Sequence, residues 1–313
     1  MKDYIKAFAP ATVANVACAF DILGFAVDQP GDEVIVTPND KSGITITSIT
    51  GDNKRLPLDP KKNTATVAVQ AFLDKLGQKD VGLNVEINKK MPLGSGMGSS
   101  AASAAAALVA INALFDYPFS KRELIPFAME SEGVACGSKH VDNAAPAIMG
   151  GFVLIRSYEP LDVIEIPSPE NLFCTLAHPI LELNTSDSRR ILKKEINLSI
   201  AVKQWGNIAG LISGLYSSDF QLIGRSLTDY IFEPTRSFVI PAFNEIKTAA
   251  LSAGALGCSI SGSGPSLFAL SDSKDIAENV ANAMHEAFLK GNIQSQTYVS
   301  TINKKGAIIL EER

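Results

Sequence analysis

Met91-Pro-Leu-Gly-Ser-Gly-Met-Gly-Ser-Ser-Ala-Ala102 is the stretch on which the interpretation of the whole chain depends. It follows an alternating apolar run at residues 83–87, which predicts a half-buried strand. It leads into residues 103–115, an Ala- and Leu-rich run without Gly or Pro that predicts a helix. Glycines at every second position allow positive φ and close approach to a ligand. Ser99 and Ser100 stand at the expected helix N-terminus, where unpaired N–H groups and the helix dipole favour an anion.

Two interpretations of this stretch compete: a Gly-rich turn closed by a Ser cap without a ligand, and a loop that binds phosphate. The joint occurrence of strand, repeated glycines, paired serines and Ala-packed helix favours phosphate binding. The spacing does not match a Walker A loop, because no Gly-Lys-Ser/Thr follows. It does not match GxGxxG either, because Ser99 stands where a third glycine is required.

The same stretch resembles the ATP-binding motif of the GHMP small-molecule kinases, named for their galacto-, homoserine, mevalonate and phosphomevalonate kinase members. The usual Leu of the motif's Gly-Leu-Gly-Ser-Ser is a Met here, a mild change at an apolar position. The residues that this resemblance assigns to ATP are Pro92, Leu93, Gly94, Ser95, Gly96, Met97, Gly98, Ser99, Ser100, Ala101 and Ala102.

Composition predicts a protein with a substantial core and no affinity for nucleic acid. The 313 residues are 46% hydrophobic, enough for one large or two medium domains, and the net charge of −5 gives no basic surface. The four cysteines are far apart and without C-x-x-C spacing, which predicts reduced, buried thiols. No apolar signal region begins the chain, and the run at residues 101–115 is too short to span a bilayer. We therefore expect a soluble, cytoplasmic protein without a membrane partner.

The N-terminal segment at residues 10–21 carries two polar side chains, Asn15 and Asp21, among small apolar residues. By spacing alone, each could equally be a turn cap. The segment resembles the Pro-x-Thr-Ser-Ala-Asn-x-Gly-x-Gly-Phe-Asp motif that lines the substrate pocket of homoserine kinases. The resemblance implies a substrate role for Asn15 and Asp21, although Ala17 and Ala19 replace both glycines of the motif.

Residues 64–76 predict an amphipathic helix with Asn63 as its N-cap and Gly77 at its end. Capping alone explains Asn63. The resemblance adds a place beside the adenine, because family members use a residue near this helix start.

A further helix is predicted from the capping box at residues 120–123 to about Glu132. Glu132 falls on the apolar face with Ala128, whereas Glu130 points the other way. A carboxylate on a buried face needs a cation or hydrogen-bond donors, but a frayed helix end before the next glycine explains it equally well. The resemblance implies that Glu132 and Ser100 hold Mg²⁺.

The segment Gly137-Ser-Lys-His-Val-Asp-Asn-Ala-Ala-Pro146 gathers polar side chains in an apolar setting. These side chains could simply form hydrogen bonds with one another within a loop. It resembles the Gly-Ser-x-His-x-Asp-Asn-x-x-Pro of homoserine kinases, where mevalonate kinases have Pro-Ser-Gly-x-Asp-Asn. The resemblance implies that His140 and Asp142 contact the substrate and that Asp142 or Asn143 orients its hydroxyl. We favour positioning over base catalysis, because a nearby anionic phosphate does not help a low-pKa carboxylate take a proton.

The best linker candidate is the Pro-containing run at residues 163–170, so we expect an N-terminal domain at residues 1–168 and a C-terminal domain at residues 169–313. His178 and His285 belong to no motif and are predicted to be structural. In the C-terminal half, strands are expected at residues 172–177, 297–300 and 307–310, and helices at residues 208–220, 240–251 and 275–289.

Two arginines in the C-terminal half, Arg189 and Arg236, are surface residues by default. A substrate α-carboxylate, however, favours planar, forked donors, and homoserine kinases use arginines at these two places. Arg236 is the last residue of Glu233-Pro-Thr-Arg236, which resembles the Glu-Pro-x-Arg of homoserine kinases. The resemblance also implies substrate roles for Thr185 and Gly262. Gly262 belongs to a second Gly/Ser loop, which by itself reads as a hairpin turn.

Taken over nearly the whole chain, the resemblance implies an α+β fold, with a ribosomal-protein-S5-like N-terminal ATP-binding domain and a ferredoxin-like C-terminal domain. It implies transfer of the γ-phosphoryl group of ATP to the side-chain hydroxyl of L-homoserine, a step towards threonine, with ATP and Mg²⁺ as cofactors. A homodimer is a candidate assembly. Two alternatives stay open: another kinase of the family, which would not need two arginines aimed at a carboxylate, and a non-catalytic sensor, which would lose the Ser100 and Glu132 pair.

Overall fold

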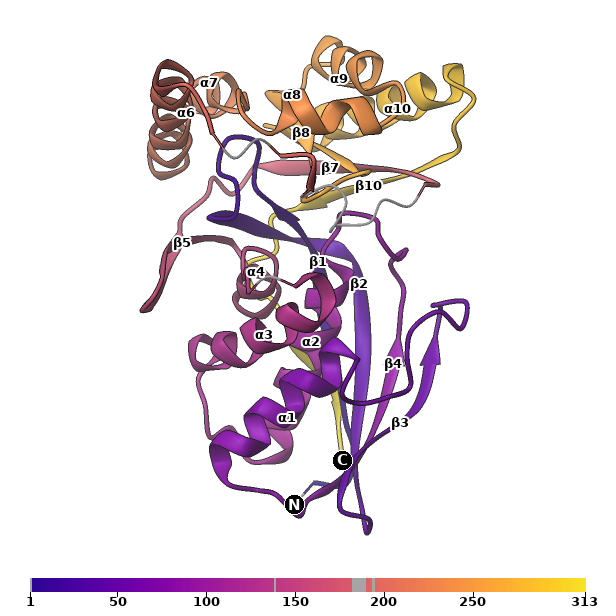
Figure 1. The fold of residues 1–313 in the computed structure, drawn as a ribbon. Coiled ribbons are helices and arrows are strands. Elements are labelled where there is room, and N and C mark those ends of the chain that lie inside the picture. Colours follow the sequence, from indigo (N-terminus) through magenta and orange to yellow (C-terminus); the bar gives the residue numbers. More distant parts are fainter. Residues whose placement is uncertain (1, 138, 182–189, 193–194) are drawn as a thin grey trace.

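The computed structural model describes residues 2–137, 139–181, 190–192 and 195–313, and it contains two sheets with helices packed on them (Figure 1). Among these residues the first sheet has seven strands, in the order β11-β1-β2-β4-β3, with β5 pairing with β2 and with β6. Its strands are β1 (Ile5–Ala14), β2 (Leu23–Asn39), β3 (Gly43–Thr50), β4 (Gly82–Asn88), β5 (Phe152–Tyr158), β6 (Leu161–Ile166) and β11 (Ile308–Glu312).

The helices of this first domain gather around one central helix. They are α1 (Thr64–Leu76), α2 (Ser99–Leu114), α3 (Lys121–Cys136) and α4 (Ala144–Met149). α2 is buried on nearly all sides because its many alanines let α1, α3, α4 and the sheet approach it closely. The central helix therefore begins at the Gly-rich stretch and runs into the core, which fixes that stretch at the edge of the domain (Figure 1).

The second domain is built on a four-stranded antiparallel sheet, among the described residues, in the order β10-β7-β9-β8. Its strands are β7 (Phe173–Pro179), β8 (Gly257–Ile260), β9 (Leu267–Ser271) and β10 (Ser295–Thr301). Its helices are α6 (Leu198–Ser217), α7 (Phe220–Ser226), α8 (Glu233–Arg236), the 3₁₀ helix η1 (Ser237–Val239), α9 (Phe243–Ser252) and α10 (Lys274–Lys290). The α+β fold in two domains is as expected from the sequence.

The expected linker is wrong in its first half. Val163 and Ile166 belong to β6, where they pair with Ile155 and Phe152 of β5. The apolar residues of this run pack against the core, and the connection to β7 begins only at Pro167. The last strand, β11, returns to the first sheet and pairs with β1, so the two termini of the described chain lie close together (Figure 1).

Local signals in the sequence set several helix ends correctly. Asn63 caps α1 by accepting from the N–H of Ala65 at 3.1 Å, and Gly77 ends it with φ of 70°. The capping box of α3 is present, since Ser120 N–H donates to Glu123 at 2.8 Å. Other ends differ. α2 begins at residue 99 rather than 103, α3 continues beyond residue 132, and the helix expected at 208–220 begins at 198.

Three cysteines and one histidine are buried, and burial shifts pKa values among them. Cys18, Cys174 and Cys258 are buried, and burial raises the pKa of Cys18 and Cys258 to about 12. His178 is buried and its Nδ1 lies 3.0 Å from Ser266 Oγ, with burial lowering its pKa to about 4.

No helix within the described parts of the chain has the length and apolarity that a membrane span requires.

Candidate active site

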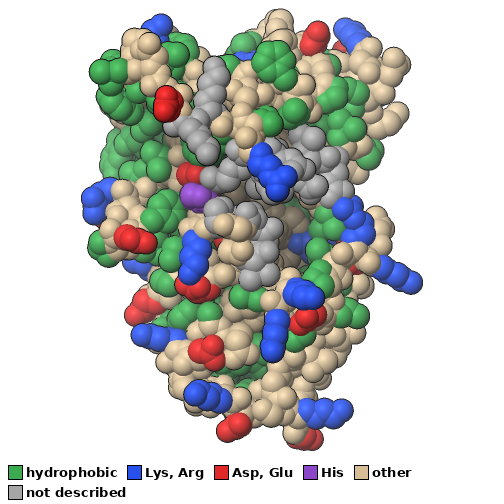
Figure 2. Space-filling view, viewed as in Figure 1, with side chains coloured by type: hydrophobic (Ala, Val, Ile, Leu, Met, Phe, Trp, Pro, Cys, Tyr) green, Lys and Arg blue, Asp and Glu red, His purple; other side chains and the backbone are tan. Residues whose placement is uncertain are grey.

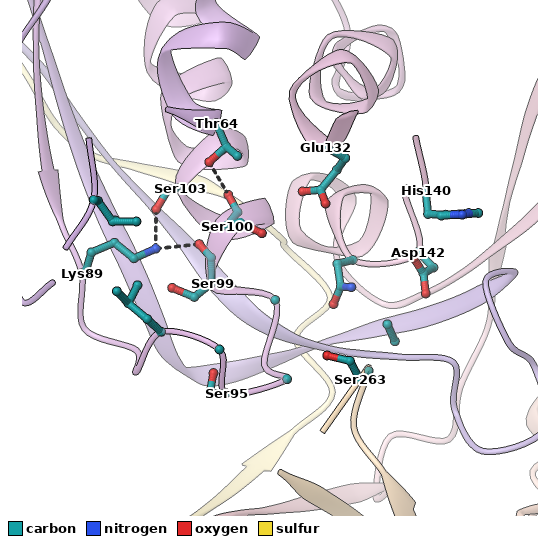
Figure 3. A pocket seen from close by; sticks show the side chains of 18 of the residues that line it. Thr64, Lys89, Ser95, Ser99, Ser100, Ser103, Glu132, His140, Asp142 and Ser263 are labelled. Atoms are coloured by element: carbon teal, nitrogen blue, oxygen red, sulfur yellow. Dashed lines mark hydrogen bonds between the residues drawn. The ribbon is translucent and has the colours of Figure 1, made fainter. Parts of the chain in front are cut away.

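A cavity of about 430 Å³ collects residues from both domains and from motifs far apart in the sequence (Figure 3). Most of the site residues that the sequence predicts line this cavity. They are Asn15, Asp21, Asn63, Leu93, Gly94, Ser95, Gly96, Gly98, Ser99, Ser100, Glu132, His140, Asp142, Asn143, Arg236 and Gly262.

Some predicted residues lie behind the cavity wall or outside the described chain. Met97, Ala101 and Ala102 are buried in the core, where they support the loop rather than face the cavity. Pro92 is half-buried and is not part of the lining. The predicted substrate residues Thr185 and Arg189 fall outside the described residues.

The Gly-rich loop adopts the positive φ angles that its glycines were expected to allow. Gly94, Gly96 and Gly98 have φ of 62°, 78° and 70°. A Cβ on Gly98 would lie 2.1 Å from the hydroxyl of Thr12, so this position has no space for any side chain. Gly98 is therefore required by close packing against another part of the chain as well as by access for a ligand.

The second Gly/Ser loop joins β8 to β9, as a hairpin should, and also packs directly on the first loop. Ser266 N–H donates to Ser95 O at 3.1 Å, and the hydroxyl of Ser261 donates to Gly96 O at 2.8 Å. Gly262 N–H reaches Ala14 O at 3.2 Å. Contacts between the two domains thus hold the two loops together at the cavity.

The carboxylate predicted on the buried face of α3 does face the cavity. Glu132 is 8% exposed and lines the cavity with Ser100, and Figure 3 shows both side chains directed into it. Glu130 instead forms an exposed ion pair with Lys139 at 2.7 Å. Among the described residues, no group of three or more His, Cys, Asp or Glu side chains could hold a metal ion by itself.

Asp21 and His140 also line the cavity, where they lie close together. His140 Nε2 is 3.4 Å from Asp21 Oδ2. Tyr158, which no motif included, donates its hydroxyl to Asp21 O at 2.6 Å and accepts from Val141 N–H at 3.4 Å. Its ring also meets the imidazole edge to face. Tyr158 therefore joins the two segments that carry the predicted substrate residues.

Asn15 uses its amide to hold other groups in place. Its Nδ2 donates to Gly262 O at 2.8 Å, and its Oδ1 accepts from Asp21 N–H at 2.9 Å. One side chain thereby connects the first domain, the second domain and the backbone of Asp21. Asn143 is held similarly, because its Oδ1 accepts from the hydroxyl of Thr12 at 2.8 Å.

Arg236 is buried, contrary to the default for an arginine. It is 4% exposed, lines the cavity, and donates from one guanidinium nitrogen to Gly262 O at 3.0 Å. Its guanidinium also lies 5.0 Å from the ring centre of Phe20, which stacks on Phe232 at 3.8 Å. The chain has thus placed a fixed cation and the Asp21 carboxylate around one cavity.

The sequence patterns missed several lining residues, among them Arg55, Lys62, Thr64 and Lys89. Lys89 comes just after β4 and forms a buried ion pair with Asp32 of β2. Burial lowers the pKa of the Lys89 ammonium, and the carboxylate of Asp32 opposes that shift. A signal for Lys89 was present: it continues the inward-facing positions of Leu83, Val85 and Ile87, where a charge is unusual.

Comparison with known proteins agrees with this geometry. Residues 63–151 match the model of the GHMP kinases N terminal domain, and residues 211–290 match that of the GHMP kinases C terminal domain. A homoserine kinase of Chlorobium phaeobacteroides is 56% identical over 98% of this chain and 99% of its own.

Solved structures give the same result. A crystal structure of homoserine kinase from Cytophaga hutchinsonii superposes with a TM-score of 0.97 at 56% identity, covering 99% of this chain and 98% of the other. A mevalonate kinase of L. major, in complex with R-mevalonate, has a TM-score of 0.72 at 16% identity, covering 95% of this chain and 96% of the other, and shares the fold.

Proposed function

The chain belongs to the homoserine kinases of the GHMP kinase family, and from this premise we propose how its residues carry the reaction. The reaction is transfer of the γ-phosphoryl group of ATP to the side-chain hydroxyl of L-homoserine, giving O-phospho-L-homoserine on the way to threonine. The observation that carries the proposal is one cavity lined both by a phosphate-type loop and by the opposite charges of Asp21 and Arg236.

ATP binds along the Gly-rich loop and the start of α2. The loop's positive-φ glycines and the N-terminal N–H groups of α2 suit the phosphates. Asn63 lines the same cavity near the start of α1, which supports a place beside the adenine, although its side chain is already used as the cap.

Magnesium is the cation that the available donors suit. Glu132 and Ser100 supply a carboxylate and a hydroxyl, and Mg²⁺ binds such hard oxygen donors together with substrate phosphates and water. When bound, the ion neutralises charge on the transferring phosphoryl group. The chain's own task is to hold these two oxygen donors towards the phosphate loop.

Phosphoryl transfer asks the protein mainly for positioning and charge stabilisation. Asp142 is 5% exposed and adjoins Asn143, whose Oδ1 is fixed by Thr12. We assign Asp142 and Asn143 to orienting the acceptor hydroxyl, with Glu132 and Ser100 acting on the phosphates. Asp142 serves here as a positioning group rather than as an early base.

Recognition of homoserine uses groups that match an amino acid zwitterion. Arg236 offers forked donors to the carboxylate, and Asp21 takes the ammonium, beside His140. Asn15 and Gly262 hold these groups in place through their mutual hydrogen bond. Arg189 and Thr185 are kept as further substrate residues on the resemblance alone.

The test of the function is a panel of acceptor substrates. ATP consumption by the purified chain is measured with L-homoserine, mevalonate and galactose under one set of conditions. We expect turnover with homoserine to exceed the others by at least 100-fold in kcat/KM. Preference for mevalonate or galactose would overturn the substrate assignment and leave only a kinase of the family.

The test of the metal site compares two neighbouring glutamates. Glu132→Gln is expected to raise the Mg²⁺ concentration needed for half-maximal turnover at least tenfold and to remove the gain in ADP affinity that Mg²⁺ gives in calorimetry. Glu130→Gln removes the surface pair with Lys139 and should leave both within about twofold. Equal losses in both variants would contradict the assignment.

The remaining assignments concern the organisation of the protein. We place the domains at residues 1–168 and 169–313, with the last strand of the chain returning to the first sheet. Limited proteolysis with mass mapping tests the boundary: a first cut between residues 167 and 172 supports it, and a first cut elsewhere contradicts it. We assign the enzyme to the cytoplasm, as suits a consumer of ATP, and cell fractionation tests that.

A homodimer fits the surface of α6. This helix has one charged residue, Lys203, and exposes Leu198, Val202, Trp205 and Tyr216 on one face. Figure 2 shows hydrophobic side chains gathered in the region of this helix, at the upper left. Sedimentation should give a dimer for the wild type and a monomer for Trp205→Asp. A monomeric wild type would contradict this assignment.

A further inference from the structure

The two ends of the Gly-rich loop meet a buried pair of opposite charges to which the proposed function gives no role. The carboxylate of Asp32 and the ammonium of Lys89 form an ion pair, with side chains 0% and 2% exposed. The pair follows from the sheet. β2 and β4 are antiparallel neighbours, and continuing the register of Glu33 opposite Asn88 by one residue sets Asp32 opposite Lys89.

Both carboxylate oxygens of Asp32 bind groups at the ends of the loop. Its Oδ1 accepts from the N–H groups of Lys90 at 2.9 Å and Met91 at 3.2 Å, where the strand leads into the loop. Its Oδ2 accepts from the hydroxyls of Ser99 at 2.9 Å and Ser103 at 3.1 Å, where the loop becomes α2. One side chain therefore fixes where the loop begins and where it ends.

The ammonium of Lys89 completes the arrangement. In addition to Asp32, it donates to the carbonyl oxygen of Ser99 at 2.8 Å and to the hydroxyl of Ser103 at 2.8 Å (Figure 3). An ammonium has three donors, and each has an acceptor here. Buried charges are costly unless they are paired and hydrogen-bonded, so loss of either partner would leave the other in an unfavourable state.

The same contacts give different roles to the adjacent residues Ser99 and Ser100. The hydroxyl of Ser99 is committed to Asp32 and its side chain is buried. Ser100 is exposed to the cavity. A hydroxyl ligand for phosphate or metal therefore comes from Ser100, while Ser99 contributes backbone groups.

We propose that Asp32 and Lys89 are positioning residues that clamp the two ends of the Gly-rich loop and so determine the affinity for the phosphates of the nucleotide. The inference rests on the proposed ATP site. A loop held in its binding shape loses less conformational entropy when a ligand arrives, and a released loop must be ordered by the ligand. The hydrogen bonds of the clamp go to the two ends of the Gly-rich loop, so homoserine binding should be affected little.

The experiment is calorimetric titration of the full chain with ADP, together with steady-state kinetics. Asp32→Asn is expected to raise the Kd for ADP and the KM for ATP at least tenfold, with the KM for homoserine within about twofold. The matched control is Lys90→Met, which removes the neighbouring, half-exposed ion pair with Glu33. It should leave all three constants within about twofold. If Asp32→Asn instead raises both KM values, or lowers only the thermal stability, the variant acts through a general loss of packing and the clamp is contradicted.

A milder variant keeps the test decisive if Asp32→Asn does not fold. Ser103→Ala removes one hydroxyl from the clamp and should raise the Kd for ADP about two- to fivefold. Unchanged ADP binding in every folded clamp variant would overturn the clamp. Gly98→Val separates this failure from that of the ATP site. If Gly98→Val loses ADP and the clamp variants do not, only the clamp fails, whereas unchanged binding in Gly98→Val contradicts the ATP site itself.

Discussion

Two tight loops line the cavity, and they are built from different residues. The ATP-side loop turns on Gly94, Gly96 and Gly98, all at positive φ. The loop at residues 15–21 also turns at positive φ, but with Asn15, Val16, Ala17 and Asp21, whose φ angles are 70°, 36°, 60° and 61°. Side chains in this region cost about 1–2 kcal/mol each, and a β-branched residue is a genuine outlier.

The comparison shows that the two loops obtain their shapes from different sources. Glycine makes the first loop's turns intrinsically accessible. The second loop depends on contacts from distant segments: Asn15 to Gly262 at 2.8 Å, and Tyr158 to Asp21 at 2.6 Å. Strained backbone of this kind persists only where the surroundings over-determine it, and it is common at ligand sites. The substrate loop should therefore respond to changes far from it in sequence.

The largest expected effect is on the glycine side. Gly98→Val should abolish measurable ADP binding, because a side chain at φ of 70° would lie 2.1 Å from Thr12 Oγ1. Gly77→Val is the matched control, since Gly77 also has φ of 70° but faces open space. It should lower stability by about 1–2 kcal/mol and leave ADP binding unchanged. Similar ADP affinities in the two variants would show that the clash is unimportant.

A pH-dependent effect is expected beneath the contact between the two Gly-containing loops. His178 lies on Ser266, whose N–H holds the ATP-side loop, and burial lowers the pKa of His178 from 6.5 to about 4. The unfolded chain takes up this proton near pH 6.5 and the folded chain does not. The contribution of neutral His178 to the free energy of unfolding is therefore fully present above pH 6.5 and is lost as the pH falls towards 4. At about 1.4 kcal/mol per pKa unit, this loss is up to about 3 kcal/mol.

Denaturant unfolding between pH 7.5 and 4.5 measures this slope. His178→Asn should be less stable at neutral pH but should lose less stability on acidification than the wild type. His285→Asn, the same change at a histidine outside this contact, serves as the control. A wild-type slope in His178→Asn would show that the proton uptake lies elsewhere.

A smaller effect is expected on the substrate side. Tyr158→Phe removes the hydroxyl that holds Asp21 O and Val141 N–H. A net hydrogen-bond contribution of about 0.5–1.5 kcal/mol corresponds to roughly a two- to tenfold rise in the KM for homoserine, with the KM for ATP unchanged. Tyr117→Phe, at an exposed tyrosine, serves as the control in the same kinetic assay. A rise in the KM for ATP instead would show that Tyr158 acts on the nucleotide site and not on the loop at residues 15–21.

Local patterns in the sequence predicted the parts of the site that depend on local structure. Strand alternation, glycine spacing and the caps of α1 and α3 identified the ATP-side loop, and helix periodicity placed Glu132 inward and Glu130 outward. Asp32 lies in β2, and Lys89 continues the inward-facing positions of β4 just after that strand ends. The pattern therefore contained both charges, but the pairing of β2 with β4 was needed to join them.

Other features could not be read from local pattern. The contact of Asn15 with Gly262 spans 247 positions, and burial of Arg236 depends on packing against Phe20. The return of β11 to the first sheet likewise follows from tertiary pairing, since five residues of strand specify no partner by themselves. The linker predicted at residues 163–170 overlaps β6 because Pro167 and Pro169 lie just after this strand, where they end it rather than replace it.

The division of the cavity between nucleotide and amino acid is tested most directly by pairing Arg236→Ala with trimmed substrates. Homoserine is compared with 3-aminopropan-1-ol, which lacks the carboxylate, and with 4-hydroxybutyrate, which lacks the ammonium. An ion pair of about 2–5 kcal/mol predicts that the wild type prefers homoserine over 3-aminopropan-1-ol by roughly 30-fold or more in kcat/KM. In Arg236→Ala this preference should shrink at least tenfold, while the preference over 4-hydroxybutyrate and the KM for ATP persist. Arg225→Ala, at an exposed arginine, should behave as the wild type. Equal losses with homoserine and 3-aminopropan-1-ol in Arg236→Ala would contradict the account, because Arg236 would then not be reading the carboxylate.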